Sequence, residues 1–197
     1  MTQLWRAFGD LVPIALVVGG VVGVGVFLGS WAHRGLERSR AAVGTAVVDA
    51  LLAIWGLCYL AVTLAPAAGA EDSTVQLVPL RDLDDYAHAV SWQVPVAQVG
   101  GNLVLYGALG VLLAARWRWG VPRTVAVGAL IAVVDEGLQW LLGTGRSVTT
   151  DDVIVGAVGV AIGATVVVLA RSVLAWAARR RAAAGVPVAA GAGQRWR

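Results

Sequence analysis

The chain has 197 residues, of which 58% are hydrophobic and 14% are charged, and its formal net charge is +3. A soluble domain of this length cannot bury so much apolar surface, so the composition excludes an ordinary water-soluble protein and indicates an integral membrane protein. All 15 basic residues are arginines, and they are spread along the chain rather than gathered in one patch. This distribution argues against a nucleic-acid partner.

Five apolar segments are long enough to cross a bilayer, which takes about 20 helical residues. They predict an all-α, polytopic fold with about five transmembrane helices in the cell membrane. Arginines are concentrated after the first, third and fifth segments. Because cytoplasmic loops carry the excess of basic residues, we expect the N-terminus outside and the C-terminus in the cytoplasm. The predicted spans are 11–32, 44–65, 96–115, 121–142 and 153–176.

Residues 1–181 are predicted to form one transmembrane domain, and 182–197, rich in alanine and glycine, a disordered cytoplasmic tail. An acidic external loop, 66–95, is longer than a connection requires. Within it Leu83, Tyr86, Ala87 and Val90 recur at helical spacing. The spacing favours a short amphipathic helix on the outer membrane surface, and a solvated acidic loop is the alternative.

Two carboxylates, Asp135 and Glu136, fall inside the fourth predicted span. A charge at the centre of a spanning helix costs about 2.5 to 3.5 kcal/mol, so such groups usually face a helix-bundle interior or a water-filled cavity. Gln139 lies one turn beyond Glu136 on the same helix face. Because neighbouring helical residues point about 100° apart, one carboxylate is expected to line a site while the other contacts a neighbouring helix.

Further polar residues are expected at the same outer depth. The predicted ligand-binding set, with Glu136 and Asp152 as the acid/base candidates, is Asn102, Glu136, Gln139, Arg146, Asp151 and Asp152. Thr149 or Thr150 can cap the last span. Asp49, near the cytoplasmic end of the second span, is expected either to snorkel to the membrane surface or to pair with a loop arginine, and it is not included in the site.

A purely structural network is the alternative to a binding site. In it Arg146 pairs with Asp151 or Asp152, and Glu136 bonds Gln139 or Asn102. Glycine pairs at small-residue spacing predict close helix approach in the first and last spans: Gly19 and Gly23, Gly25 and Gly29, Gly159 and Gly163.

Several kinds of site are not supported by the sequence. It contains no Gly-x-Ser-x-Gly elbow, no His-Glu-x-x-His motif and no phosphate-binding loop. In the predicted topology His33 and His88 lie on opposite sides of the membrane, which argues against a histidine metal site. We therefore expect neither a metal nor a cofactor.

The order of these motifs resembles the VanZ-like family of small bacterial membrane proteins, over about 76–164. The matching motifs are Gln76-Leu77-Val78-Pro79-Leu80, Asn102 with Gly107 and Gly110, Glu136-x-x-Gln139, Gly145-Arg146, and Asp151-Asp152 followed by Gly159 and Gly163. The chain departs from the family at Tyr106-Gly107, where the family has phenylalanine and proline, and at Gly156, where it has asparagine.

The resemblance implies a role at the bacterial cell envelope, since the family is associated with resistance to the glycopeptide antibiotic teicoplanin. Together with the outward polar cluster, it favours a protein that binds or modulates an amphiphilic envelope molecule: a cell-wall precursor, a lipoglycopeptide antibiotic or a membrane lipid. A membrane-embedded acid/base enzyme acting on a lipid-linked substrate and a proton-coupled transporter or flippase are the alternatives. The sequence leaves the oligomeric state open.

Overall fold

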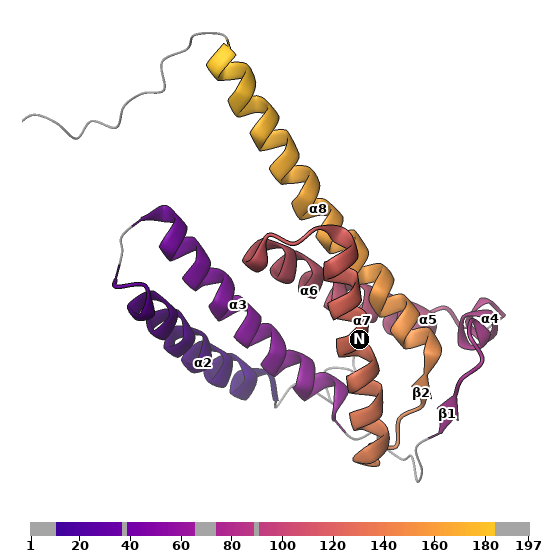
Figure 1. The fold of residues 1–197 in the computed structure, drawn as a ribbon. Coiled ribbons are helices and arrows are strands. Elements are labelled where there is room, and N and C mark those ends of the chain that lie inside the picture. Colours follow the sequence, from indigo (N-terminus) through magenta and orange to yellow (C-terminus); the bar gives the residue numbers. More distant parts are fainter. Residues whose placement is uncertain (1–10, 37–38, 66–73, 89–90, 184–197) are drawn as a thin grey trace, which may run out of the picture.

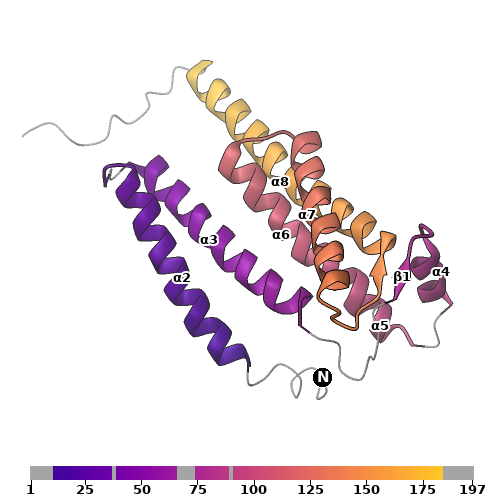
Figure 2. The same cartoon turned by 60° about the horizontal axis from the view of Figure 1, so that its bottom comes forward.

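The computed structural model describes residues 11–36, 39–65, 74–88 and 91–183. Long helices dominate these residues, and the short elements lie at one end of the bundle (Figures 1 and 2). In chain order the elements are α2 (Leu11–His33), α3 (Arg40–Thr63), β1 (Val75–Gln76), α4 (Arg81–Ala87), α5 (Gln93–Pro95), the π-helix η1 (Val96–Gly100), α6 (Gly101–Trp117), α7 (Val121–Leu141), β2 (Val148–Thr149) and α8 (Thr150–Ala183).

Within the described residues, four segments are long and apolar enough to cross a membrane, and α2 is a further apolar helix. The four are α3, η1 with α6, α7, and α8. The expected all-α, multi-pass membrane fold is therefore confirmed, while the orientation of the termini stays a prediction. Helix α8 continues to Ala183, two residues into the expected tail, and 184–197 lies outside the described residues.

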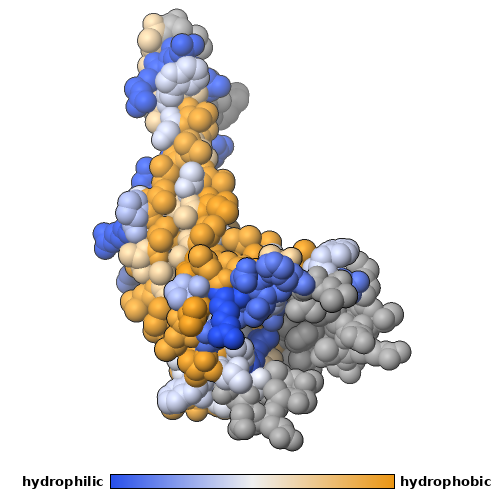
Figure 3. All heavy atoms as spheres, turned by 90° about the vertical axis from the view of Figure 1, so that its right-hand side faces the viewer, coloured by the Kyte–Doolittle hydropathy of each residue, from blue (hydrophilic) through white to orange (hydrophobic). Residues whose placement is uncertain are grey.

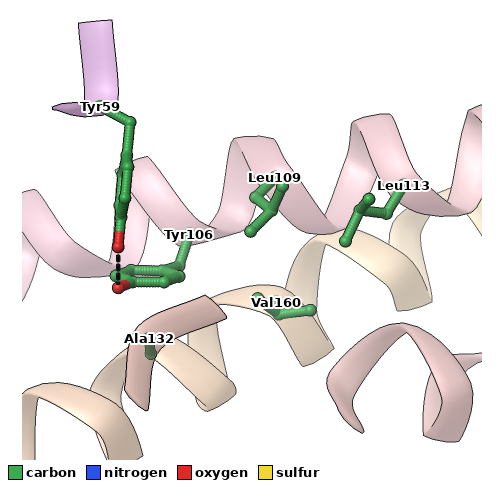
Figure 4. Packing of buried hydrophobic residues seen from close by; sticks show 6 residues of the cluster. All are labelled: Tyr59, Tyr106, Leu109, Leu113, Ala132 and Val160. Atoms are coloured by element: carbon green, nitrogen blue, oxygen red, sulfur yellow. Dashed lines mark hydrogen bonds between the residues drawn. The ribbon is translucent and has the colours of Figure 1, made fainter. Parts of the chain in front are cut away.

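Two groups of helices make up the bundle. Helices α2 and α3 form an antiparallel hairpin, whereas α8 packs against both α6 and α7 (Figure 2). Tyr59 of α3 reaches α6, where its hydroxyl lies 2.6 Å from the hydroxyl of Tyr106 (Figure 4). The buried apolar cluster joins α3, α6, α7 and α8 through Tyr59, Tyr106, Leu109, Leu113, Ala132 and Val160.

Glycines set the distance between α6 and α8. A Cβ atom on Gly163 would collide with the backbone of Gly107, and one on Gly110 would collide with the backbone of Val160. The predicted close approach at Gly159 and Gly163 is confirmed, because both face α6. By contrast, Gly25 and Gly29 have open space beside them in the described part of the chain.

An ionic cluster connects three helices at the end of the bundle that is predicted to be cytoplasmic. Asp49 of α3 bonds Arg34, which follows α2, across 3.1 Å and also pairs with Arg116 of α6. Ser30 donates to the same carboxylate at 2.5 Å. The expectation that Asp49 pairs with loop arginines is thus confirmed for Arg34, and the cluster ties α2, α3 and α6 together.

Hydrophobic residues cover much of the bundle, with hydrophilic ones at the tip of α8 and around α4 (Figure 3). The 34 residues of α8 correspond to a length of about 50 Å. A hydrocarbon core is about 30 Å thick, so the last turns of α8, with Arg179, Arg180 and Arg181, extend past it.

Candidate functional site

A two-stranded parallel pair folds the loop between α3 and α6 back onto the bundle. Val75 pairs with Val148 and Gln76 with Thr149, and the amide of Val148 donates to the carbonyl of Thr74 at 2.8 Å. This pairing places the segment after β1 beside the start of α8. Nothing in the sequence predicted it, because two residues per strand are too few to set a pattern.

Asp151 holds the N-terminus of α4. Its Oδ1 accepts from the amide of Leu80 at 2.5 Å and its Oδ2 accepts from the amide of Leu83 at 3.1 Å. The side chain is buried, and it is not among the residues that line the cavity described below. This corrects the predicted role of Asp151: its carboxylate holds a helix end, where a negative charge is favourable, rather than facing a ligand.

The expected short helix in the external loop is α4, over Arg81–Ala87. It presents Asp82 and Tyr86 to the cavity. Its position on the membrane surface stays a prediction, and Val90 lies outside the described residues. Burial and the nearby carboxylates of Asp152 and Asp82 raise the pKa of the Tyr86 hydroxyl above its ordinary value, so it remains a hydrogen-bond donor at neutral pH.

A polar cavity of about 450 Å³ lies where α3 and α7 end and α6 and α8 begin. It is enclosed by four helices of the bundle together with α4, η1 and the loop before β2. Five of the six predicted ligand-binding residues line it: Asn102, Glu136, Gln139, Arg146 and Asp152. The sequence did not single out its further polar residues Asp82, Tyr86, Gln98, Tyr106 and Ser147.

The π-helix η1 leads into the cavity wall. It follows Pro95, and its Gln98 and the first residues of α6, Gly101 and Asn102, line the cavity. Short π-helical turns within α-helices occur frequently at functional sites.

The carboxylates of α7 have different partners. Asp135 accepts from Thr63 of α3 at 2.9 Å and from Gln139 at 2.8 Å, whereas Glu136 accepts from the amide of Thr149 at 2.9 Å. The expectation that one carboxylate contacts a neighbouring helix is confirmed, because Asp135 joins α7 to α3. The predicted bond from Glu136 to Gln139 or Asn102 is wrong. The side-chain amide of Gln139 donates to Asp135 instead, and that of Asn102 donates to Asp152.

Asn102 and Asp152 connect α6 to α8. The Asn102 amide donates to Oδ1 of Asp152 at 2.7 Å, and the backbone amide of Asp152 donates to the Thr149 hydroxyl at 3.1 Å. The predicted capping of α8 by a threonine is therefore confirmed for Thr149. Asp152 is only partly buried, so its carboxylate faces the cavity as well.

Arg146 anchors the loop to α3. Its guanidinium donates to the carbonyls of Val62 at 3.1 Å and Thr63 at 3.4 Å, in the last turn of α3. The predicted ion pair between Arg146 and Asp151 or Asp152 is wrong: in the described ranges no side-chain bond joins them. Cations near a helix C-terminus are stabilising, which explains this choice of partner.

The charges of the cavity wall are unbalanced. Among the described lining residues, four are carboxylic acids and one is a guanidinium: Asp82, Asp135, Glu136, Asp152 and Arg146. Within those same residues no group of three or more histidine, cysteine or acidic side chains is arranged to hold a metal ion. The wall therefore offers many hydrogen-bond acceptors and a single strong anion-binding group.

One family model matches the chain. Residues 50–171, more than half of the chain, match the family model described as VanZ/LLP1. The matched range is wider than 76–164 and includes the second half of α3, which supplies Tyr59 and Thr63. No curated protein and no solved structure matches the chain.

Proposed function

The chain belongs to the VanZ/LLP1 family, and we propose that it binds the head group of an amphiphilic envelope molecule in the polar cavity. The observation that carries this proposal is the cavity itself, about 450 Å³ lined by four carboxylic acids inside an apolar helix bundle. In a purely structural network, the polar side chains would pack against one another and leave no cavity of this size. A cavity of this size, lined by charges that are costly to place in a membrane, favours a ligand instead.

The charges of the wall restrict the head group. Arg146 suits a phosphate or carboxylate, which a guanidinium binds through paired N–H donors. Glu136, Asp135 and Asp152 suit hydroxyl, amide or ammonium groups, because carboxyl oxygens accept hydrogen bonds from such donors. A head group that combines one anionic group with several donors satisfies both. A purely anionic head group would meet repulsion from most of the wall.

Three kinds of envelope molecule have this chemistry: a cell-wall precursor, a lipoglycopeptide antibiotic and a zwitterionic phospholipid. We place the protein in the bacterial cell membrane with the cavity facing outward, as the arginine distribution predicts. Binding of a lipoglycopeptide or of its cell-wall target there would contribute to glycopeptide resistance.

Acid/base catalysis on a lipid-linked substrate is the second candidate. It is favoured by one observation, that Glu136 and Asp152 line the same cavity from α7 and α8. Turnover separates the two candidates. An enzyme loses product formation in Glu136→Gln while substrate stays bound, whereas a binding protein forms no product in either form.

The test compares lipids that remain with the protein after mild detergent extraction, identified by liquid chromatography and mass spectrometry. Arg146→Gln keeps an amide donor for the α3 carbonyls and removes the charge. Arg81→Gln is the matched control, because Arg81 is exposed and does not line the cavity. We expect Arg146→Gln to lose a retained amphiphile that the wild type and Arg81→Gln keep. Identical lipid profiles in all three proteins would contradict the proposal.

A further inference from the structure

An apolar groove of about 270 Å³ lies beside the polar cavity, between α3 and α7. Its walls are Tyr59 and Leu60 of α3 and a row of α7 that includes Leu130, Val134 and Leu138. Apart from Tyr59 and Asp135, the lining side chains are hydrocarbon. Leu130 is 62% exposed and Val134 53% exposed, so the groove is open along its side.

The shape of the groove suits a chain that lies along α7. Leu130, Val134 and Leu138 are spaced by four residues, so they form one row about 12 Å long on a single face of α7. The lining of this row is almost wholly hydrocarbon, so a single hydrocarbon chain can lie along it.

The groove and the cavity share their boundary. Asp135 lines both, and its two oxygens accept from Thr63 and Gln139, which line the cavity. Tyr59 of the groove bonds Tyr106 of the cavity across 2.6 Å. The polar surface of the cavity and the apolar surface of the groove are therefore separated by only a few side chains.

The two spaces are also arranged in the order of a lipid. The cavity lies at the end of α7, near Leu141, where Arg146 of the following loop and Asp152 of α8 line it. Leu138 lies close to that end and Leu130 near the middle of α7. A lipid in one leaflet likewise has its head group at the membrane surface and its chains directed toward the midplane.

We propose that this groove seats one hydrocarbon chain of the amphiphile whose head group occupies the cavity, and that the amphiphile enters sideways from the outer leaflet between α3 and α7. The inference rests on the proposed function, and it narrows the ligand class to molecules with an extended acyl or prenyl chain. The partly exposed row on α7 is the face along which the chain slides in.

The test uses the full chain in vesicles of phosphatidylethanolamine and phosphatidylglycerol. A small fraction of the phosphatidylethanolamine carries a photoreactive diazirine in the middle of one acyl chain. This head group has the phosphate and ammonium that Arg146 and the carboxylates suit. After irradiation, mass spectrometry of peptides measures the adducts on Leu130 and Leu138.

Two adjacent positions give a matched pair of variants. Val133 and Val134 are both 53% exposed, and only Val134 lines the groove. We expect Val134→Phe to lower the adduct yield on Leu130 and Leu138 by at least about fivefold, an apparent loss of about 1 kcal/mol. Val133→Phe is expected to leave the yield near that of the wild type. Equal yields in the two variants would overturn the inference.

Arg146→Gln separates this inference from the proposed function. If the adducts respond to Val134→Phe and also fall in Arg146→Gln, the groove and the head-group site hold one molecule. Adducts that respond to Val134→Phe alone would contradict the proposed head-group site and leave the groove as a lipid-chain site. Adducts that fall in Arg146→Gln alone would support the head-group site and refute the groove.

Discussion

The hydroxyl of Thr63 donates to Oδ1 of Asp135 across 2.9 Å, and this buried bond joins the end of α3 to the carboxylate shared by the cavity and the groove. The same hydroxyl lies 3.0 Å from the carbonyl of Tyr59. The contact with Asp135 joins two helices, whereas the contact with Tyr59 lies within α3. Thr63 thereby fixes α3 against α7 beside a carboxylate that lines both spaces.

Removing that hydroxyl is expected to destabilise the protein. In Thr63→Val, Asp135 loses the Thr63 donor while remaining buried, which costs about 1–3 kcal/mol of unfolding free energy. The control is Thr165→Val on α8, because the Thr165 hydroxyl is exposed and bonds only the carbonyl of Ala161 within its own helix. Unfolding in mixed detergent micelles measures both variants, and an equal loss in the two would contradict the assignment.

Gly163→Ala is expected to separate α6 from α8. Its added methyl group would collide with the carbonyl of Gly107, and a backbone oxygen cannot move aside as a side chain can. Overpacking of this kind costs about 1–3 kcal/mol. Gly137→Ala on α7 is the matched control, since nothing lies within 4 Å of that position. Thermal unfolding should show a lower midpoint for Gly163→Ala alone.

Asp151→Asn is expected to loosen α4. The carboxylate accepts from the amides of Leu80 and Leu83, and an asparagine offers one acceptor oxygen in place of two. Hydrogen exchange at these two amides should accelerate by about tenfold or more, as expected for the loss of about 1–3 kcal/mol. Asp85→Asn, an exposed change on the same helix, serves as the control. Unchanged exchange in Asp151→Asn would refute the anchoring role.

The orientation of the chain can be measured with a matched pair of serines. Ser147 lies at the cavity end and Ser39 at the opposite end, both are exposed, and each side chain makes one hydrogen bond. In a Cys58→Ala background, a membrane-impermeant maleimide added to intact cells should label Ser147→Cys and not Ser39→Cys. The reverse pattern would place the cavity in the cytoplasm and contradict the outward site.

Hydropathy was sufficient to locate the helices, because the length of an apolar run is a local property of the chain. The cost of Asp135 and Glu136 in hydrocarbon likewise pointed to the site from composition alone. Composition could not show which of the adjacent Asp151 and Asp152 lines the cavity. Which of them faces a cavity depends on the segment before α4, which reaches α8 only through the pairing of β1 with β2.

Partner choice was also outside what spacing can predict. Arg146 bonds carbonyls of α3 that lie more than 80 residues away in the sequence, rather than a neighbouring carboxylate. The positions of Tyr59 and Tyr106 in the sequence did not predict the hydrogen bond between their hydroxyls, which joins α3 to α6. Such contacts follow from how helices pack, which one sequence does not specify.

The most direct test of a head group in the polar cavity is to fill the cavity without removing any polar contact. Gly101 lines the cavity and Gly137 does not, and nothing lies within 4 Å of a Cβ atom at either position. Native mass spectrometry would count the amphiphiles retained by the wild type, Gly101→Phe and Gly137→Phe. If the cavity holds the head group, an amphiphile stays bound to the wild type and to Gly137→Phe, and none stays bound to Gly101→Phe. Equal retention by all three proteins would contradict it.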